Sequence, residues 1–460
     1  MFRFSGFFLL TILGVLLSGC VTNNLYYEAA MKQPTAEYQH SFSNGSGDNP
    51  IKIHMDYVGN IYPKSGFPEN YAVNRNGRKN DLEDVFLTKK PLVCDKEVAG
   101  ETEILCQKEL SWEDRQLAIW NRRAEEILAA WEAVDGNADI VFLVHGFNVN
   151  DGTQEYESYR RLLIDYHEVQ NPLIFVEIHW DGLFSLLRLP AWPKGQYSGH
   201  LVGFKLRQLF NMMDDRRGGN GVKPRIRFIT HSSGAFVTAA TFGNSLAAFP
   251  NYLEDNHRDE YYAVYFQNRG LTLEQFEKTP SDQHHEFVLR QYRIPNMLDF
   301  RAAMFAAATS TNSFAMDPRK LPEKRKYDNI RAAQDVEYGW LDTGNSTLGF
   351  TVTKDDWALN KVILWATAFG ASTMGREAHY YCDFVEDTFK KKGVKSHIFN
   401  FDRGTIEGST TKNFVRKYLE SRSHSMNVYL RQPQAKQLVK MLFEDKPANL
   451  EYEIICPETP

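Results

Sequence analysis

One stretch constrains the fold of this chain more than any other: residues 225–243, with the sequence RIRFITHSSGAFVTAATFG. Basic and apolar residues alternate over 225–229, as in a strand, whereas residues 235–249 form an alanine-rich apolar run of helical length. The stretch therefore predicts a strand, a tight turn and a helix, with Ser232 at the apex of the turn.

The turn THSSG, residues 230–234, follows the pattern G-x-S-x-G with threonine in place of the first glycine. In this pattern a strained turn exposes a serine to a base, and backbone N–H groups nearby stabilise an oxyanion. The alternative is that H-S-x-G occurs by chance at an ordinary strand-to-helix junction. Whether Ser232 is a nucleophile therefore depends on whether the chain also supplies a base and an acid for it.

Length and charge limit the class of protein. With 460 residues, 43% of them hydrophobic and 24% charged, the chain is long enough for one large α/β domain or two to three small domains. The net charge is −5 and no long basic run occurs, so nucleic acid is not expected as a partner.

The N-terminus predicts a secretory signal. A short basic region precedes an apolar segment over residues 7–17, and LSGC at 17–20 ends it. This ending resembles the lipobox of bacterial lipoproteins, which implies cleavage before Cys20 and its acylation, a stable anchor when two or more chains are attached. Val21 follows in place of an aspartate, which favours the outer over the inner membrane. A plain secretory peptide or short membrane anchor is the alternative.

The four remaining cysteines are an even number, as expected for disulfides in an oxidising compartment. Four cysteines allow three pairings. We prefer Cys94 with Cys106 and Cys382 with Cys456, and buried free thiols are the alternative. Because no C-x-x-C or C-x-x-H spacing occurs, a metal site is not expected.

A second signature is the apolar run ADIVFLV at 138–144, which ends abruptly in HGFN. Such a run predicts a parallel strand covered on both faces, and ligands bind beyond the carboxyl ends of such strands. We expect the N–H groups of Phe147 and Ser233 to form an oxyanion hole. His145 is more typical of a structural hydrogen-bonding residue than of a base.

VFLVHGFN followed by THSSG resembles the α/β-hydrolase superfamily, and specifically a group of bacterial hydrolases with an HGFN loop. The resemblance covers about residues 138–445. It implies a doubly wound, mostly parallel sheet and a catalytic serine. The helical pattern around Tyr156 and the strand-like LIFVEIHW at 173–180 fit the β-α-β order of such a fold.

In this fold the acid and the base follow the serine in the order Ser, Asp, His. The strand-like run 348–352 is followed by DWAL at 356–359, which matches the D-x-A-L of the related hydrolases, so Asp356 is the expected acid. Asp402, which ends another strand-like run, is its rival, and Asp355 is a weaker one.

The base is expected in SHSM at 423–426, a polar segment that resembles the G-H-S loop of the family, with Ser423 replacing its glycine. His424 is therefore the expected base. His379 and His397 are the alternatives, and both positions are more typical of structural histidines.

The sequence thus predicts an α/β protein of five segments. These are a lipoprotein signal peptide (1–19), a tether or loosely packed arm (20–75), an extension with a long helix capped by Ser111 (76–137), a hydrolase domain (138–445) with a lid-like insertion at about 250–295, and a C-terminal tail (446–460).

The expected function is that of a serine hydrolase of the cell envelope, acting on an ester, thioester or related acyl substrate, either a small molecule or a lipid. Ser232 would attack the carbonyl, His424 would transfer the proton and Asp356 would orient His424, with no metal or organic cofactor required. The N-terminal lipid would join the protein to the membrane. The alternative is a non-catalytic lipoprotein that uses the same fold as a binding or assembly module.

Overall fold

The computed structural model describes, by number, residues 21–22, 50–56, 59–64, 82–87, 94, 98–146, 153–166, 171–180, 184–185, 188–217, 224–242, 299–309, 346–353, 356, 359, 374–376, 378, 381–382, 386–391, 393–401, 424–444 and 450–457.

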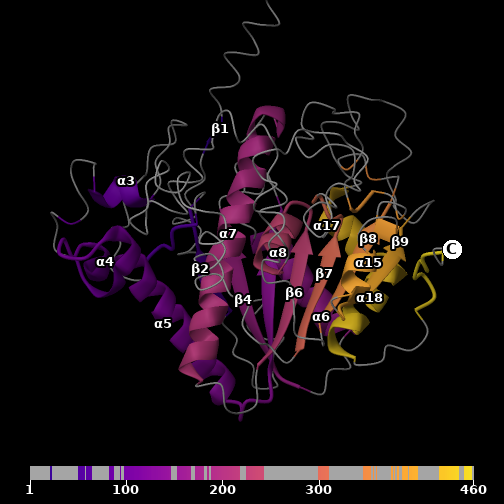
Figure 1. Ribbon diagram of the computed structural model, residues 1–460, viewed down its shortest axis with the longest axis horizontal. Helices are drawn as coiled ribbons and strands as arrows, with labels where there is room; N and C mark the ends of the chain where they lie inside the picture. The colour runs from indigo at the N-terminus through magenta and orange to yellow at the C-terminus, as the bar shows by residue number, and fades with distance from the viewer. Residues whose placement is uncertain are drawn as a thin grey trace, which may run out of the picture.

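A seven-stranded sheet lies at the centre of the molecule, and each neighbouring pair of its strands is parallel (Figure 1). Its order is β2 (Ile51–His54), β4 (Leu173–His179), β3 (Asp139–Val144), β6 (Arg225–His231), β7 (Asp299–Phe305), β8 (Thr347–Val352) and β9 (Lys395–Asn400). The predicted α/β class with a parallel sheet is confirmed.

Both faces of the sheet are covered, which explains the near-continuous apolar run of β3. Ile140 and Phe142 belong to one hydrophobic core, and Val141 and Leu143 to a second. The first core includes residues of α5 (Trp112–Glu132), α7 (Arg188–Arg216) and α8 (Gly234–Phe242). The second includes residues of α6 (Thr153–Tyr166), α17 (Met426–Leu430) and α18 (Pro433–Phe443).

The order of the strands indicates where a ligand would bind. From β3 the chain crosses to β4 on one side, then returns past β3 to β6 and continues outward through β7, β8 and β9. The direction of winding therefore reverses between β3 and β6. In open α/β sheets such a reversal creates a crevice at the carboxyl ends of the strands, where ligands bind.

Of the two alternating arginines of β6, Arg227 is buried and Arg225 is partly exposed. Arg227 is 1% exposed, and its guanidinium lies 3.0 Å from Asp139 and 2.7 Å from Asp299, on the two neighbouring strands. Arg225 contacts Asp139 as well, at 3.0 Å. A buried charge is tolerated when it is paired in this way, so these arginines fasten the amino ends of three strands.

Within the segment expected to be a tether or loosely packed arm, residues 51–54 instead form a strand of the sheet. β2 pairs with β4, and Ile53 and Met55 are fully buried. The Met55 N–H continues the pairing by donating to the carbonyl of His179. Because β2 is only four residues long, it has too short an alternating pattern to stand out from its polar surroundings.

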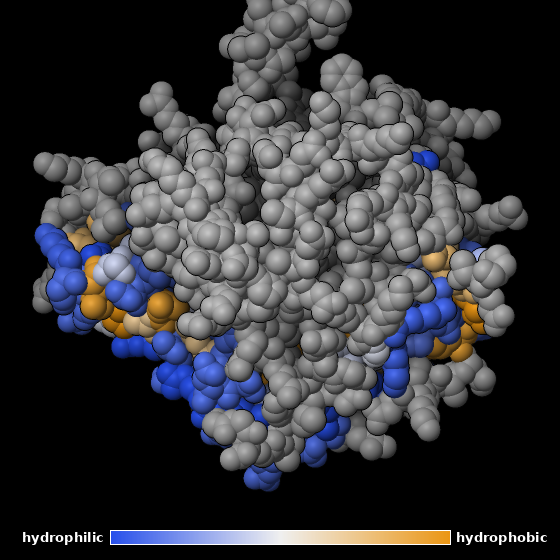
Figure 2. All heavy atoms as spheres, in the orientation of Figure 1, coloured by the Kyte–Doolittle hydropathy of each residue, from blue (hydrophilic) through white to orange (hydrophobic). Residues whose placement is uncertain are grey.

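The extension before β3 packs beside the sheet through α5, a helix of 21 residues. Its expected cap is present, since the Ser111 hydroxyl accepts a hydrogen bond from the Asp114 N–H at 3.1 Å. Trp120 and Trp131 face the first core. On the face shown in Figure 2, the outer surface of α5 is largely hydrophilic.

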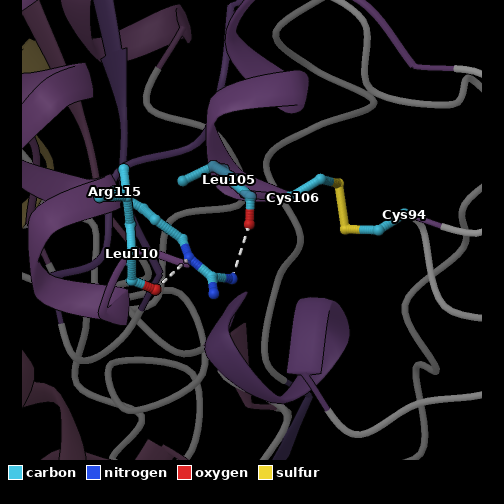
Figure 3. Close-up of a disulfide and its surroundings, with 5 residues drawn as sticks. All are labelled: Cys94, Leu105, Cys106, Leu110 and Arg115. Atoms are coloured by element: carbon cyan, nitrogen blue, oxygen red, sulfur yellow. Dashed lines mark hydrogen bonds between the residues drawn. A yellow bond between two sulfur atoms is a disulfide. The ribbon is translucent and has the colours of Figure 1, made fainter. Parts of the chain in front are cut away.

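Two disulfides hold peripheral segments to this frame. Cys94 is bonded to Cys106, at the end of α4 (Gly100–Leu105). Figure 3 shows that Arg115 of α5 donates to the carbonyls of Leu105 and Leu110, each at 3.0 Å, so the bonded turn is also tied to α5. Another short helix in the described part of this region is α3 (Leu82–Leu87).

The second disulfide, Cys382–Cys456, reaches the C-terminal segment. This segment lies along the outer edge of β9, where Ile454 donates to Ile398 and Asn400 donates to Tyr452. The bonds cover an edge strand that would otherwise expose unpaired backbone groups. The helix α15 (Glu386–Lys391) precedes β9.

A short ribbon stands apart from the main sheet. β1 (Val21–Thr22) pairs antiparallel with β5 (Phe184–Ser185), which connects β4 to α7. Residues 1–20, which include the signal segment and Cys20, and the insertion at about 250–295 lie outside the described residues. Among the helices that are described, none combines the length and the apolar character needed to cross a bilayer.

Candidate active site

The turn between β6 and α8 has the strained backbone expected at the serine of this pattern. Ser232 has a positive φ of 52°, which is uncommon for a residue other than glycine. Its N–H donates to the carbonyl of Phe305, and its carbonyl accepts from the N–H of Ala308, at 2.9 and 3.1 Å. Bonds from the end of β7 therefore hold the strained residue in place.

The glycines of the two sequence motifs allow these motifs to touch. A Cβ on Gly234 would lie 2.9 Å from the carbonyl oxygens of both Val144 and His145. A Cβ on Gly146 would lie 3.0 Å from the Cβ of Ser232. The turn after β3 therefore packs directly against the turn that carries the serine, and side chains at these glycines would separate them.

The structure brings together the three residues expected to form a catalytic triad. His424 Nε2 lies 2.6 Å from Ser232 Oγ, and His424 Nδ1 lies 2.7 Å from Asp356 Oδ2. Asp356 is fully buried just beyond the carboxyl end of β8, and His424 precedes α17 with its side chain 16% exposed. The three side chains form one continuous chain of contacts.

Asp356 also accepts hydrogen bonds from two other groups, which stabilise its negative charge. The Tyr429 hydroxyl donates to Oδ2 at 2.5 Å, and the Leu359 N–H donates to Oδ1 at 3.3 Å. Burial alone would raise the pKa of Asp356, but the His424 imidazole and these hydrogen bonds lower that pKa overall. An ionised carboxylate only accepts, so the His424 proton lies on Nδ1 and Nε2 is left to accept the Ser232 proton.

Of the two expected oxyanion donors, Ser233 is described. It immediately follows Ser232 at the start of α8, and within the described residues its N–H has no acceptor. Phe147 lies outside the described residues. The chain leading to it is described as far as Gly146, whose backbone lies against Ser232.

His145 holds this turn rather than reaching Ser232. Its carbonyl accepts a hydrogen bond from the Trp180 indole at 3.0 Å, and the two rings stack with centroids 5.5 Å apart. Its N–H donates to the Tyr156 hydroxyl at 3.3 Å. These contacts hold the backbone at His145 in place, which fits the structural role expected for His145.

The other candidate residues are away from the serine or cannot be placed. His397 lies on β9, and its Nδ1 contacts Glu453 of the C-terminal segment at 2.6 Å. Asp355, Asp402 and His379 lie outside the described residues.

Sequence reasoning missed two features of the site. Tyr429 was not connected with the acid, although it stands five residues after His424. Glu155 was also missed; its carboxylate lies 2.8 Å from His231 Nδ1, beside the triad. The spacing of Glu155 and Tyr159 could have indicated that this carboxylate is partnered. The two residues lie four positions apart on one face of α6, and their side chains are hydrogen-bonded at 2.8 Å.

Nothing in the described residues forms a cluster of three or more His, Cys, Asp or Glu side chains suited to hold a metal ion. The site as described consists of a serine, an imidazole, a carboxylate and the Ser233 N–H, a set suited to nucleophilic acyl transfer. Neither a scan of protein-family models nor a search of curated proteins found a match to the chain.

Proposed function

We propose that this protein is a serine hydrolase of the α/β-hydrolase type, which transfers an acyl group from its substrate to water. The main support for this proposal is that His424 contacts both Asp356 and Ser232, and that Ser232 lies on a strained turn. The positions of the three residues after β6, β8 and β9 in the order Ser, Asp, His also support it.

In the first half of the reaction, Ser232 Oγ attacks the substrate carbonyl while His424 Nε2 takes the hydroxyl proton. His424 then gives this proton to the leaving alcohol or thiol, and an acyl-serine remains. In the second half, His424 takes a proton from water as the water oxygen attacks the acyl-serine. His424 then returns this proton to Ser232 Oγ as the acyl–oxygen bond breaks, which releases the carboxylic acid and restores the free serine. Asp356 keeps the imidazole in the required tautomer and stabilises its charged form.

The oxyanion formed in both halves needs preorganised donors. The Ser233 N–H is one donor, at the start of a helix whose dipole also favours negative charge. The Phe147 N–H is the second donor in this proposal. No metal or organic cofactor takes part in these steps.

The substrate class proposed is an acyl lipid or another acyl ester or thioester at the membrane, reached through acylation of Cys20. β1 begins at Val21, and its partner β5 begins four residues after Trp180, a span of at most about 14 Å. In Figure 1, β1 lies beyond the carboxyl ends of the strands of the main sheet, and Cys20 directly precedes β1 in the sequence. This arrangement supports a site that faces the outer-membrane lipid.

Labelling with a fluorophosphonate, a probe that reacts with activated serines, tests the proposal. We expect the purified protein to form one covalent adduct, on Ser232, and Ser232→Ala to form none. Ser233→Ala is the matched control, because it removes the neighbouring hydroxyl and keeps the backbone N–H. Absence of labelling in the folded wild-type protein would favour the non-catalytic binding or assembly module instead.

A further inference from the structure

A second pair of a carboxylate and an imidazole lies beside the triad. Glu155 Oε1 lies 2.8 Å from His231 Nδ1, and the two side chains are only 9% and 8% exposed. The ring of His231 packs against the ring of His424, with centroids 5.0 Å apart and planes inclined by 38°. A buried carboxylate is thus separated from the proposed base by a single imidazole.

The charge of Glu155 follows from its surroundings. Burial alone would raise the pKa of Glu155, but the His231 and His145 imidazoles and the Tyr159 hydroxyl lower that pKa overall. The pKa of Tyr159 is raised well above its ordinary value by burial and by the Glu155 charge, so this hydroxyl stays protonated and donates to Glu155. Glu155 is therefore ionised at neutral pH.

Other titratable groups lie around this pair. Glu155 on α6, His424 just before α17 and Tyr429 within α17 lie against His231, whereas Tyr159 on α6 and His145 after β3 interact with Glu155. Asp356 contacts Nδ1 of His424, whereas the His231 ring lies beside the His424 ring with the two planes inclined by 38°. Of these described groups, Glu155 supplies the negative charge on the His231 side.

Building on the proposed hydrolase function, we propose that Glu155 and His231 are positioning residues for His424. The His231 ring, held by Glu155, limits the tilt of the His424 ring. The Glu155 carboxylate also stabilises the positive charge that His424 gains when it takes the serine proton. The charge acts across a water-poor region, where electrostatic interactions are weakly screened.

The test is the pH profile of ester hydrolysis by Glu155→Gln, with rates expressed per active site counted by fluorophosphonate labelling. The Glu155 charge favours the positive charge that forms on His424 during the reaction, and the variant removes that charge. The acid limb of kcat/KM should therefore move to lower pH, and kcat should fall roughly tenfold, as for one partly screened charge. KM for an uncharged ester should stay unchanged, because Glu155 acts through His231 and not on the substrate.

Two further variants separate charge from packing. Glu155→Asp keeps the charge, so it should restore the acid limb to within a few tenths of a pH unit of the wild type. Glu157→Gln makes the same change of charge two residues further along α6, about 200° around the helix, and should leave the profile unchanged. A Glu155→Gln profile that coincides with the wild type, or a Glu157→Gln shift of equal size, would overturn the proposal.

An NMR titration of the His424 ring in Ser232→Ala gives a second readout that needs no activity. In that background, Glu155→Gln should move the titration of His424 to lower pH, and an unmoved midpoint contradicts the proposal even if hydrolysis is never detected. Failure of wild-type labelling would instead count against the hydrolase function, so the two failures are distinguishable. If Glu155→Gln does not fold, His424 is titrated in Glu155→Asp and His231→Gln, and only His231→Gln should move the midpoint.

Discussion

The hydroxyl of Tyr429 and the imidazole of His424 contact the same atom, Asp356 Oδ2, at 2.5 and 2.7 Å. Tyr429 belongs to α17, which begins two residues after His424. The helix therefore connects the proposed base and a donor to the proposed acid in one short rigid unit. The carboxylate is held from both sides, which orients the lone pair that faces His424.

Tyr429→Phe removes this donor and keeps the ring. Because a hydrogen bond to a charged group contributes about 1.5–3 kcal/mol, we expect kcat/KM to fall roughly tenfold or somewhat more, with the fold retained. The measurement is kcat/KM for an ester, normalised to labelled sites. Tyr452→Phe, at the half-buried C-terminal segment, is the matched control; equal losses in both variants would contradict the role given to Tyr429.

Because the pKa of Asp356 is lowered, the free energy of unfolding should depend on this residue at acid pH. A carboxylate whose pKa is lower in the folded state stabilises that state above its unfolded pKa of about 3.9, and this contribution is lost as pH falls through the folded pKa. The free energy of unfolding of the wild type should therefore decrease more than that of Asp356→Asn below about pH 4. Denaturant unfolding at several pH values measures it, and parallel curves for both proteins would show that Asp356 is not held in its charged form.

Gly234→Ala should destabilise the protein and slow labelling of Ser232. The added Cβ would lie 2.9 Å from two backbone carbonyl oxygens, which must shift and carry the turn with them. Overpacking of this kind costs about 1–3 kcal/mol. Thermal unfolding and the labelling rate check the prediction, with Ala235→Gly one residue later in α8 as a control for helix propensity. A variant as stable and as quickly labelled as the wild type would mean that the two motifs do not pack as described.

Cys20→Ser tests the proposed anchor. We expect this variant to leave the membrane fraction or to fail to mature, because the acylated residue is lost. A soluble short-chain ester should be hydrolysed at the wild-type rate by any mature variant, whereas an ester embedded in vesicles should be hydrolysed more slowly. Normal processing with unchanged, detergent-requiring membrane retention would remove the lipoprotein proposal.

Much of the site could be anticipated because its signals are local. The change from strand to helix at Ser232, and the runs before His145 and Asp356, are patterns of neighbouring residues, and the structure has strands where they were expected. The order Ser, Asp, His then limited the search for partners. The structure brings His424 to Ser232, while the catalytic role of the three residues stays a prediction.

Other features depend on tertiary contacts that no local pattern carries. β2 is a strand because β4 offers it an edge, and His231 is paired because α6 brings Glu155 to it. The long helix α7 has no strong periodic pattern, and Pro190 and Pro193 stand within its first turns. Its close approach to α8, where a Cβ on Gly203 would lie 2.5 Å from the Ala240 Cβ, is visible only in three dimensions.

If Ser232, His424 and Asp356 act as one catalytic unit, a double-mutant cycle of kcat/KM will show it. Asp356→Asn alone should lower the rate by up to about 10⁴, because the imidazole loses its tautomer and support. Residues that act as a unit are not additive, so His424→Ala with Asp356→Asn should be no slower than His424→Ala alone. A double variant whose loss is the product of the two single losses, or an Asp356→Asn variant that keeps most of its activity, would show that the three residues do not act as one unit.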